Sequence, residues 1–218
     1  MKFDREALER AMTLYAVTDR SWLKAGETLP QAVEQAILGG ATFVQLREKE
    51  LDHDAFLALA LEIREVCRRH KVPFVINDDV QIALESGADG VHVGQSDMAA
   101  AKARTILGPD AIIGVSVHTV EEAMEAAAQG ADCLGVGTMF YTGTKPDAEA
   151  VTFDTLREIC REISLPTVAI GGIGAHNIME LKGTGISGVA VVSAIFAADD
   201  VRSAAAQLHQ LAEEVKTD

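Results

Sequence analysis

The chain has 218 residues, of which 48% are hydrophobic and 24% are charged, a composition that is typical of a folded globular protein and excludes a disordered one. Nineteen Lys and Arg residues against 33 Asp and Glu residues give a formal net charge of −14, which argues against a general nucleic-acid-binding protein. The length suits one large domain with a substantial buried core.

Eight short runs of apolar, mostly β-branched residues recur along the chain and predict strands. The first run starts at residue 13 and the last at residue 188, so 175 residues divide into seven intervals of 25. Segments of helical periodicity, such as 56–67 and 120–128, lie between the runs, and the segment at about 4–12 predicts a lead-in helix that covers the bottom of the fold. The predicted strands are 13–17, 42–46, 73–76, 90–93, 112–117, 133–137, 167–170 and 188–192.

Glycine-led turns connect four of the predicted helices to the strand that follows. They begin at Gly39, Gly87, Gly130 and Gly185, where glycine suits the left-handed backbone at a helix C-terminus. Near-continuously apolar strands are typical of a parallel sheet that helices cover. Strict alternation of eight strands with helices therefore predicts an α/β fold, a single (β/α)8 TIM barrel over residues 1–218. A doubly wound open sheet is the alternative.

Polar residues follow the strands at the end where barrel enzymes carry their sites. Alternation along the second strand puts Gln45 and Arg47 on the same side, with Lys49 two residues further on. Lys145 follows the sixth strand, so three cations converge on one rim of an acidic protein, which favours an anion site. The alternative is a solvated loop in which Arg47, Glu48 and Lys49 pair with one another.

A glycine run at 171–174 follows the seventh strand and leads into a predicted short helix at 175–181. Exposed backbone N–H groups and a helix N-terminus would bind a phosphate there. Ser193 opens another helical stretch after the eighth strand, and phosphate sites after these two strands recur in this fold. The alternative is a pair of tight turns without a ligand.

Asp78 and Asp97 follow adjacent strands, so their carboxylates can approach each other. Two carboxylates beside basic residues suit a Mg²⁺ ion that bridges a diphosphate, because Mg²⁺ combines few protein oxygens with phosphate oxygens and water. The alternative is that the two residues serve only as N-caps of the predicted helices 79–85 and 98–107. Asp79 is expected to face solvent.

Four further residues near the same rim have roles that the sequence leaves open. His92 and His118 lie on or just after strands, without a neighbouring nucleophile or metal ligand in the sequence, and are expected to pack or to support other groups. Trp22 and Tyr141 lie in predicted loops, where an aromatic side chain either packs locally or covers a bound ring.

The expected compartment follows from the cysteines and the N-terminus. Cys67, Cys133 and Cys160 form no Cys-x-x-Cys pair, so we expect reduced thiols and no zinc site. The N-terminal segment has no signal-peptide pattern, and no run approaches the ~20 apolar residues that a membrane-spanning helix needs. The sequence predicts a cytoplasmic protein without a membrane or nucleic-acid partner, and it leaves open whether the chain forms a homo-oligomer.

Eight motifs, in this order and across nearly the whole chain, resemble thiamine phosphate synthase. They are LYAVTDR at 14–20, QLREK at 45–49, IND at 76–78, VGQSD at 93–97, GVSVHT at 114–119, GTMFYTGTK at 137–145, AIGGI at 169–173 and VVSAI at 191–195. The resemblance implies a transferase that condenses hydroxymethylpyrimidine diphosphate with a hydroxyethylthiazole phosphate. It implies dissociative loss of diphosphate, assisted by one Mg²⁺ per active site.

The resemblance also implies residue roles. Around the pyrimidine and its diphosphate it implies Gln45, Arg47, Lys49, Asn77, Ser116 and Lys145, of which Arg47, Lys49, Ser116 and Lys145 would be catalytic. Around the thiazole phosphate it implies Thr142, Gly143, Thr144, Gly172, Val192 and Ser193. It implies that Asp78 and Asp97 hold the metal. Two rival functions are a related thiazole tautomerase-like barrel, for which His118 would transfer the proton, and a non-catalytic barrel that binds a phosphorylated ligand.

Overall fold

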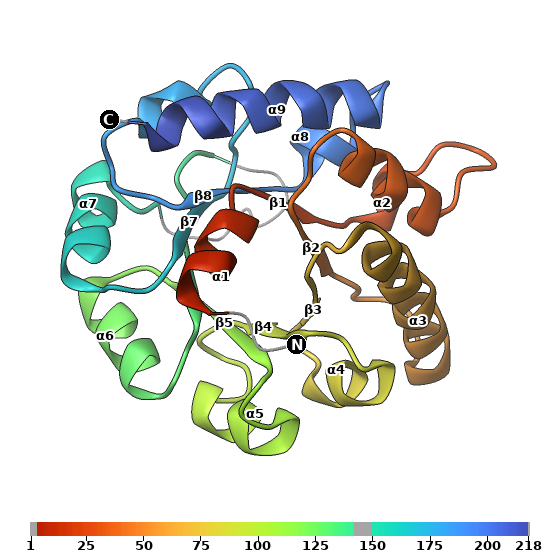
Figure 1. Ribbon diagram of the computed structural model, residues 1–218, viewed down its shortest axis with the longest axis horizontal. Coiled ribbons are helices and arrows are strands. Elements are labelled where there is room, and N and C mark those ends of the chain that lie inside the picture. The colour runs from red at the N-terminus through yellow and green to blue at the C-terminus, as the bar shows by residue number, and fades with distance from the viewer. Residues whose placement is uncertain (1–3, 142–149, 218) are drawn as a thin grey trace.

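Eight parallel strands close into a barrel (Figure 1). The strands are β1 (Leu14–Val17), β2 (Phe43–Leu46), β3 (Phe74–Asn77), β4 (Gly90–Val93), β5 (Ile112–Val117), β6 (Cys133–Val136), β7 (Thr167–Ile170) and β8 (Gly188–Val191). The computed structural model describes residues 4–141 and 150–217. Each strand pairs with the next, and β8 pairs with β1 through Leu14 and Val189. This closure confirms the predicted (β/α)8 fold and excludes the open sheet.

Helices surround the barrel (Figure 1). They are α1 (Arg5–Ala11), α2 (Leu29–Leu38), α3 (His53–His70), α4 (Val80–Ser86), α5 (Ala100–Leu107), α6 (Val120–Ala128), α7 (Phe153–Glu162), α8 (Ser193–Phe196), α9 (Val201–Lys216) and the short 3-10 helices η1 (Arg20–Trp22) and η2 (Ile178–Leu181). The helices predicted at 56–67 and 120–128 are confirmed as parts of α3 and α6. Within the two described ranges, no helix is long and apolar enough to cross a membrane.

The short helix predicted at 175–181 forms only over its second part, as the 3-10 helix η2. The Asn177 side chain explains the difference. Its Oδ1 accepts the Gly174 N–H at 2.8 Å, and its Nδ2 donates to the Gly172 carbonyl at 2.9 Å. The backbone after the glycine run is therefore held in a turn by a side chain, and no α-helical N-terminus follows β7 directly.

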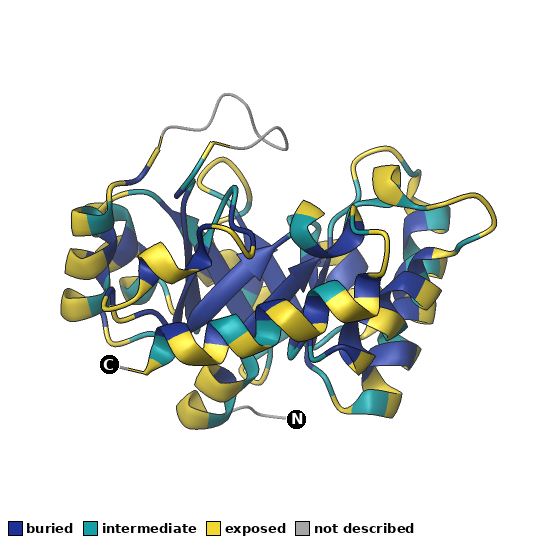
Figure 2. Ribbon diagram, turned by 90° about the horizontal axis from the view of Figure 1, so that it is seen from above, coloured by how far each residue is buried: buried dark blue, intermediate teal, exposed yellow. Residues whose placement is uncertain are grey.

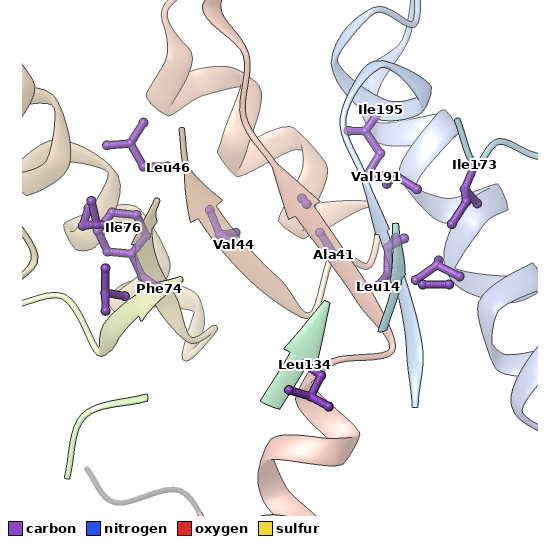
Figure 3. Close-up of a cluster of buried hydrophobic side chains, with 14 of the residues drawn as sticks. Leu14, Ala41, Val44, Leu46, Phe74, Ile76, Leu134, Ile173, Val191 and Ile195 are labelled. Carbon is purple, nitrogen blue, oxygen red and sulfur yellow. The ribbon is translucent and has the colours of Figure 1, made fainter. Parts of the chain in front are cut away.

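Alternation along each strand separates two hydrophobic cores. Outward-facing side chains such as Leu14, Val44 and Ile76 are fully buried between the sheet and the helices (Figure 3). The helices turn buried faces toward the strands and exposed faces outward, as the colours of Figure 2 show. This outer layer is the larger core, and each fully buried Leu, Ile or Val contributes about 1.5–3 kcal/mol.

A smaller core fills the interior of the barrel at its N-terminal end. Tyr15 and Phe43 point into it, with their ring centroids 4.3 Å apart. Helix α1 lies across this end of the barrel, and its Leu8 packs onto the inner core together with Met12 (Figure 1). The resulting apolar floor leaves the opposite, C-terminal end of the interior to other side chains.

The glycine-led turns have the left-handed backbone that the sequence predicts, with one shift of position. Gly87 ends α4 at a φ of +63°. In the first turn Gly40 adopts a φ of +111°, whereas Gly39 is right-handed. Gly39 is needed for space instead, because a Cβ there would lie 2.3 Å from the Arg202 carbonyl oxygen on α9.

Replacing Gly188 with alanine is expected to cost about 3 kcal/mol of unfolding free energy, the upper end of the usual overpacking range. A Cβ at this position would lie 2.1 Å from the Met12 carbonyl oxygen and 2.5 Å from that of Thr13, which are backbone atoms at the point of barrel closure. Urea unfolding measures the loss.

The matched control is Gly26→Ala, because Gly26 has a φ of +82° and a Cβ added there would meet nothing within 4 Å. This variant reports only the cost of placing a side chain on a residue with a positive φ, which is on the order of 1 kcal/mol of unfolding free energy. Equal losses in the two variants would contradict the close approach at Gly188.

Candidate active site

A cavity opens at the C-terminal ends of the strands, above the apolar floor. Inward-facing positions build its wall, alternating with the outward-facing residues of the outer core. Seven of the predicted site residues line it together: Gln45, Arg47, Asn77, Ser116, Gly172, Val192 and Ser193. Three others, Lys49, Asp78 and Asp97, lie in the loops after β2, β3 and β4. The remaining four, Thr142, Gly143, Thr144 and Lys145, fall outside the described residues.

A buried phenol holds Gln45 at the base of the cavity. The Gln45 Nε2 donates to the Tyr15 hydroxyl at 2.7 Å, and the two residues are 5% and 1% exposed. Burial, reinforced by Cys133, raises the pKa of Tyr15, so the phenol stays neutral. The Gln45 Oε1 atom of the side-chain amide has no partner within the described part of the chain, so it is available to accept a hydrogen bond from a ligand.

His92 supports Ser116 from the neighbouring strand. The His92 Nε2 and the Ser116 Oγ lie 3.0 Å apart, and the imidazole meets the Tyr15 ring edge-on. Two glycines make room for this ring, because a Cβ at Gly114 would lie 2.4 Å from its Nδ1 and one at Gly135 would lie 3.2 Å from its Cε1. His92 is therefore part of the cavity wall and positions the Ser116 hydroxyl.

Glu48 turns away from the cationic residues beside it in sequence. Its carboxylate pairs with the Arg20 guanidinium on η1, where Nη2 lies 3.3 Å from Oε1 and Nε is closer to Oε2. Arg47 lines the cavity, and its N–H donates to the buried Thr18 hydroxyl at 3.1 Å. No carboxylate in residues 4–141 or 150–217 lies within ion-pair distance of Arg47. The alternative of mutual ion pairs within this segment is wrong.

The Asp78 and Asp97 carboxylates lie next to each other at the ends of β3 and β4. The Lys49 Nζ donates to the Asp78 Oδ2 at 2.6 Å, and the Asp97 Oδ2 accepts the Gly94 N–H at 2.8 Å. Burial raises the pKa of Asp97, the Gly94 N–H opposes that effect, and the adjacent Asp78 carboxylate reinforces it. Two like charges are thus held together with one lysine beside them, which is an arrangement that favours a further cation.

Neither of these two carboxylates caps a helix. The N-cap of α4 is Asp79, whose side chain accepts the Ile82 N–H at 2.9 Å, and α5 begins after Ala99 without a side-chain cap. Asp78 has a φ of +64°, a conformation that a short polar residue tolerates better than most. The alternative in which Asp78 and Asp97 serve only as caps is wrong.

Backbone groups dominate the opposite wall, at the ends of β7 and β8. Gly171 and Gly172 have φ values of +102° and +64°, and a Cβ on Gly172 would lie 2.5 Å from the Tyr141 carbonyl oxygen. Val192 precedes α8, and Ser193 begins it, so its first N–H groups have no acceptor within the helix. Because Gly172 and Ser193 line the same cavity, this wall suits a phosphate.

The aromatic and histidine side chains at the rim are placed differently from one another. The His118 Nδ1 lies 3.1 Å from a Glu122 carboxylate oxygen, which fixes the ring at the wall of the cavity. Trp22 and Tyr141 are 46% and 88% exposed, so neither is packed into the core.

Sequence reasoning gave no role to Tyr15, Thr18 or Arg20, and it considered Glu48 only as an ion-pair partner of Arg47 and Lys49. Their contacts join residues 28 to 30 positions apart, which the sequence alone does not pair. The first three nevertheless fall within the motif at 14–20, whose match to a known family was a signal that could have singled them out.

The family model described as thiamine monophosphate synthase matches residues 14–195. A thiamine-phosphate synthase of Ruminiclostridium cellulolyticum is 52% identical over 199 residues, which cover 91% of this chain and 94% of that protein. One from Clostridium beijerinckii is 49% identical over 196 residues, covering 90% and 93%. The solved structure of a thiamine phosphate pyrophosphorylase from Pyrococcus furiosus superposes with a TM-score of 0.88 at 38% identity, over 95% of this chain and 98% of that one.

Asp97→Asn is expected to raise the free energy of unfolding at neutral pH. The folded-state pKa of Asp97 lies above its ordinary value, so ionisation opposes folding, and this penalty disappears as the pH falls through the raised pKa. Asparagine keeps an oxygen for the Gly94 N–H. Urea unfolding should show the gain at neutral pH and none at about pH 3, below the ordinary pKa of an aspartate.

The control is Asp110→Asn, because Asp110 is exposed and has no side-chain partner in the described part of the chain. It should leave the stability unchanged at both pH values. A loss of stability in Asp97→Asn at neutral pH would contradict the repulsion between the paired carboxylates.

Proposed function

Because the chain belongs to the thiamine monophosphate synthase family and its reaction is the synthesis of thiamine phosphate, we propose that the barrel cavity holds both substrates of that reaction. Hydroxymethylpyrimidine diphosphate condenses with hydroxyethylthiazole phosphate, and diphosphate leaves. The bond between the exocyclic methylene carbon and the diphosphate oxygen breaks, and its electron pair leaves with diphosphate. The lone pair of the thiazole nitrogen forms the new C–N bond, so no proton has to be removed.

The assignment of the diphosphate subsite rests on the Arg47 guanidinium. It lies in the cavity wall without a carboxylate partner among the described residues, so its charge is available to an anionic ligand. Gln45, Asn77 and Ser116 line the same side and would bind the pyrimidine and the bridging oxygen. Lys49 and Lys145 would add charge at the rim, the latter on the sequence motif alone.

Asp78 and Asp97 fit a Mg²⁺ ion by the chemistry of their donor set. The pair supplies carboxylate oxygens only, and the described ranges bring no third His, Cys, Asp or Glu to them. This small set suits an ion that completes its coordination with substrate phosphate oxygens and water. When bound, Mg²⁺ would neutralise part of the charge on the diphosphate.

The chain's own residues meet the demands of a dissociative step. Arg47, Lys49 and the Ser116 hydroxyl would stabilise the charge that develops on the leaving diphosphate. Val17, Val168, Ile170 and Ala190 line the cavity with apolar surface, which would keep water from capturing the pyrimidine cation before the thiazole does. The Gln45 Oε1 atom would accept a hydrogen bond from the pyrimidine amino group and thereby fix the plane of the ring.

Gly172, Val192 and Ser193 support a thiazole phosphate subsite on the opposite wall. Their N–H groups and the Ser193 hydroxyl suit a phosphate monoester, and Thr142, Gly143 and Thr144 would join them on the sequence motif alone. This separation places the two anions on different walls of one cavity, so that the reacting rings can meet between them.

The three free cysteines suit a reducing compartment, which supports the cytoplasm as the location.

Asp78→Asn and Asp97→Asn are each expected to abolish Mg²⁺-dependent synthesis in a barrel that stays folded. An amide keeps the shape of the side chain but loses the charge that attracts Mg²⁺. Thermal melts would check that the barrel stays folded, and a coupled assay over a magnesium series would measure synthesis. Calorimetry with magnesium diphosphate would measure the loss of binding.

Asp79→Asn is the matched control, because asparagine can still cap α4. It should retain synthesis and diphosphate binding. Normal synthesis in Asp78→Asn or Asp97→Asn would remove that residue from the metal site.

Ser193→Asp is expected to weaken the binding of thiazole phosphate at least about tenfold, because a carboxylate there would repel the phosphate and compete for the same N–H groups. Binding of the pyrimidine diphosphate should change little. Calorimetry with each substrate measures both, and Ser193→Ala separates the added charge from the lost hydroxyl. Equal weakening of the two ligands would contradict the two-wall arrangement.

A further inference from the structure

The Glu48 carboxylate is almost completely buried although it lies between two cationic neighbours at the rim of the cavity. Its side chain is 5% exposed, and the Arg20 side chain that covers it is 33% exposed. Arg20 belongs to η1, in the connection between β1 and α2, so the pair joins two loops that are 28 residues apart in sequence. The carboxylate therefore takes its counter-charge from a different loop.

The same carboxylate also shapes the loop that carries it. The Glu48 Oε1 accepts the N–H groups of Lys49 at 2.7 Å, of Glu50 at 2.8 Å and of Leu51 at 3.4 Å. Burial opposes the charged form, but the Arg20 hydrogen bond and these backbone donors outweigh it and lower the pKa of Glu48 to about 2. Glu48 is consequently charged at neutral pH, and within residues 4–141 and 150–217 none of its hydrogen-bond partners lines the cavity.

A charged glutamate at this position has an alternative set of partners close by. Arg47 and Lys49 are its sequence neighbours, and both are needed for the anionic substrate under the proposed function. Without Arg20, the Glu48 carboxylate would have to find its counter-charge within its own loop. It would then compete with the diphosphate for the same cations.

From this geometry we propose that Arg20 and Glu48 are positioning residues for diphosphate binding. Arg20 holds the Glu48 carboxylate away from the cavity, and Glu48 holds the backbone of its loop. Arg47 is thereby left to the diphosphate, and Glu48 does not draw Lys49 away from its place beside Asp78. The inference rests on the proposed function, because it assumes that Arg47 binds that group. It also makes the β1–α2 connection part of the substrate site without contact to the substrate.

The test compares the Arg20→Ala variant with the double variant Arg20→Ala/Glu48→Gln. Calorimetry with inorganic diphosphate and Mg²⁺ should show roughly tenfold weaker binding in Arg20→Ala, the scale of one competing charge at a partly exposed site. In the double variant most of that affinity should return, because glutamine still accepts the loop N–H groups and no longer competes for cations. In steady state, the KM for the pyrimidine diphosphate should rise while the KM for thiazole phosphate stays the same.

Two further variants separate the ways in which this can fail. Arg69→Ala removes a surface arginine that pairs with Glu34 between α3 and α2, and it should leave diphosphate binding unchanged. Arg47→Ala should abolish diphosphate binding. If Arg47→Ala loses binding but Arg20→Ala does not, or if the double variant is as weak as Arg20→Ala, the positioning role is overturned and the proposed function stands. If Arg47→Ala binds diphosphate normally, both are overturned.

Discussion

In a closed barrel, every second side chain of every strand points into one shared interior, and that interior has room for only a few layers. At the N-terminal end those positions carry apolar groups such as Tyr15 and Phe43, which pack under helix α1. At the other end they carry Gln45, Asn77 and Ser116, which face a cavity. Floor and site are therefore successive layers of the same strands, and the packing of the lower layer sets the depth of the upper one.

The second constraint is electrostatic, because a protein with a net charge of −14 has to present positive charge to anionic substrates. It does so by pairing the carboxylates that lie nearest to Arg47 in sequence or in space with other cations. Glu48 takes Arg20, and Asp78 takes Lys49, while Arg47 is left facing the cavity. The local balance of charge is thus decided by which residues pair, and the overall composition says little about it.

The sequence predicted those features that depend on local pattern. The regular spacing of near-continuously apolar runs and the helical periodicity between them predicted the barrel, because each strand and helix carries its own hydrophobic pattern. The short helix expected at 175–181 starts only at residue 178, because one side chain, Asn177, makes hydrogen bonds with the backbone groups of the glycine run. The Arg20–Glu48 pair could not be foreseen, since nothing local links two loops that meet only after the barrel closes.

The packed N-terminal end of the barrel also determines how ligands reach the cavity. Leu8 and Met12 close the barrel at its N-terminal end, so substrates enter and products leave through one mouth. Gln45 is 5% exposed at the bottom of that cavity, whereas Ser193 is exposed at its edge. Under the proposed assignment, both substrates and both products therefore share this opening, so diphosphate and thiamine phosphate have to leave by it before the next pair of substrates can enter.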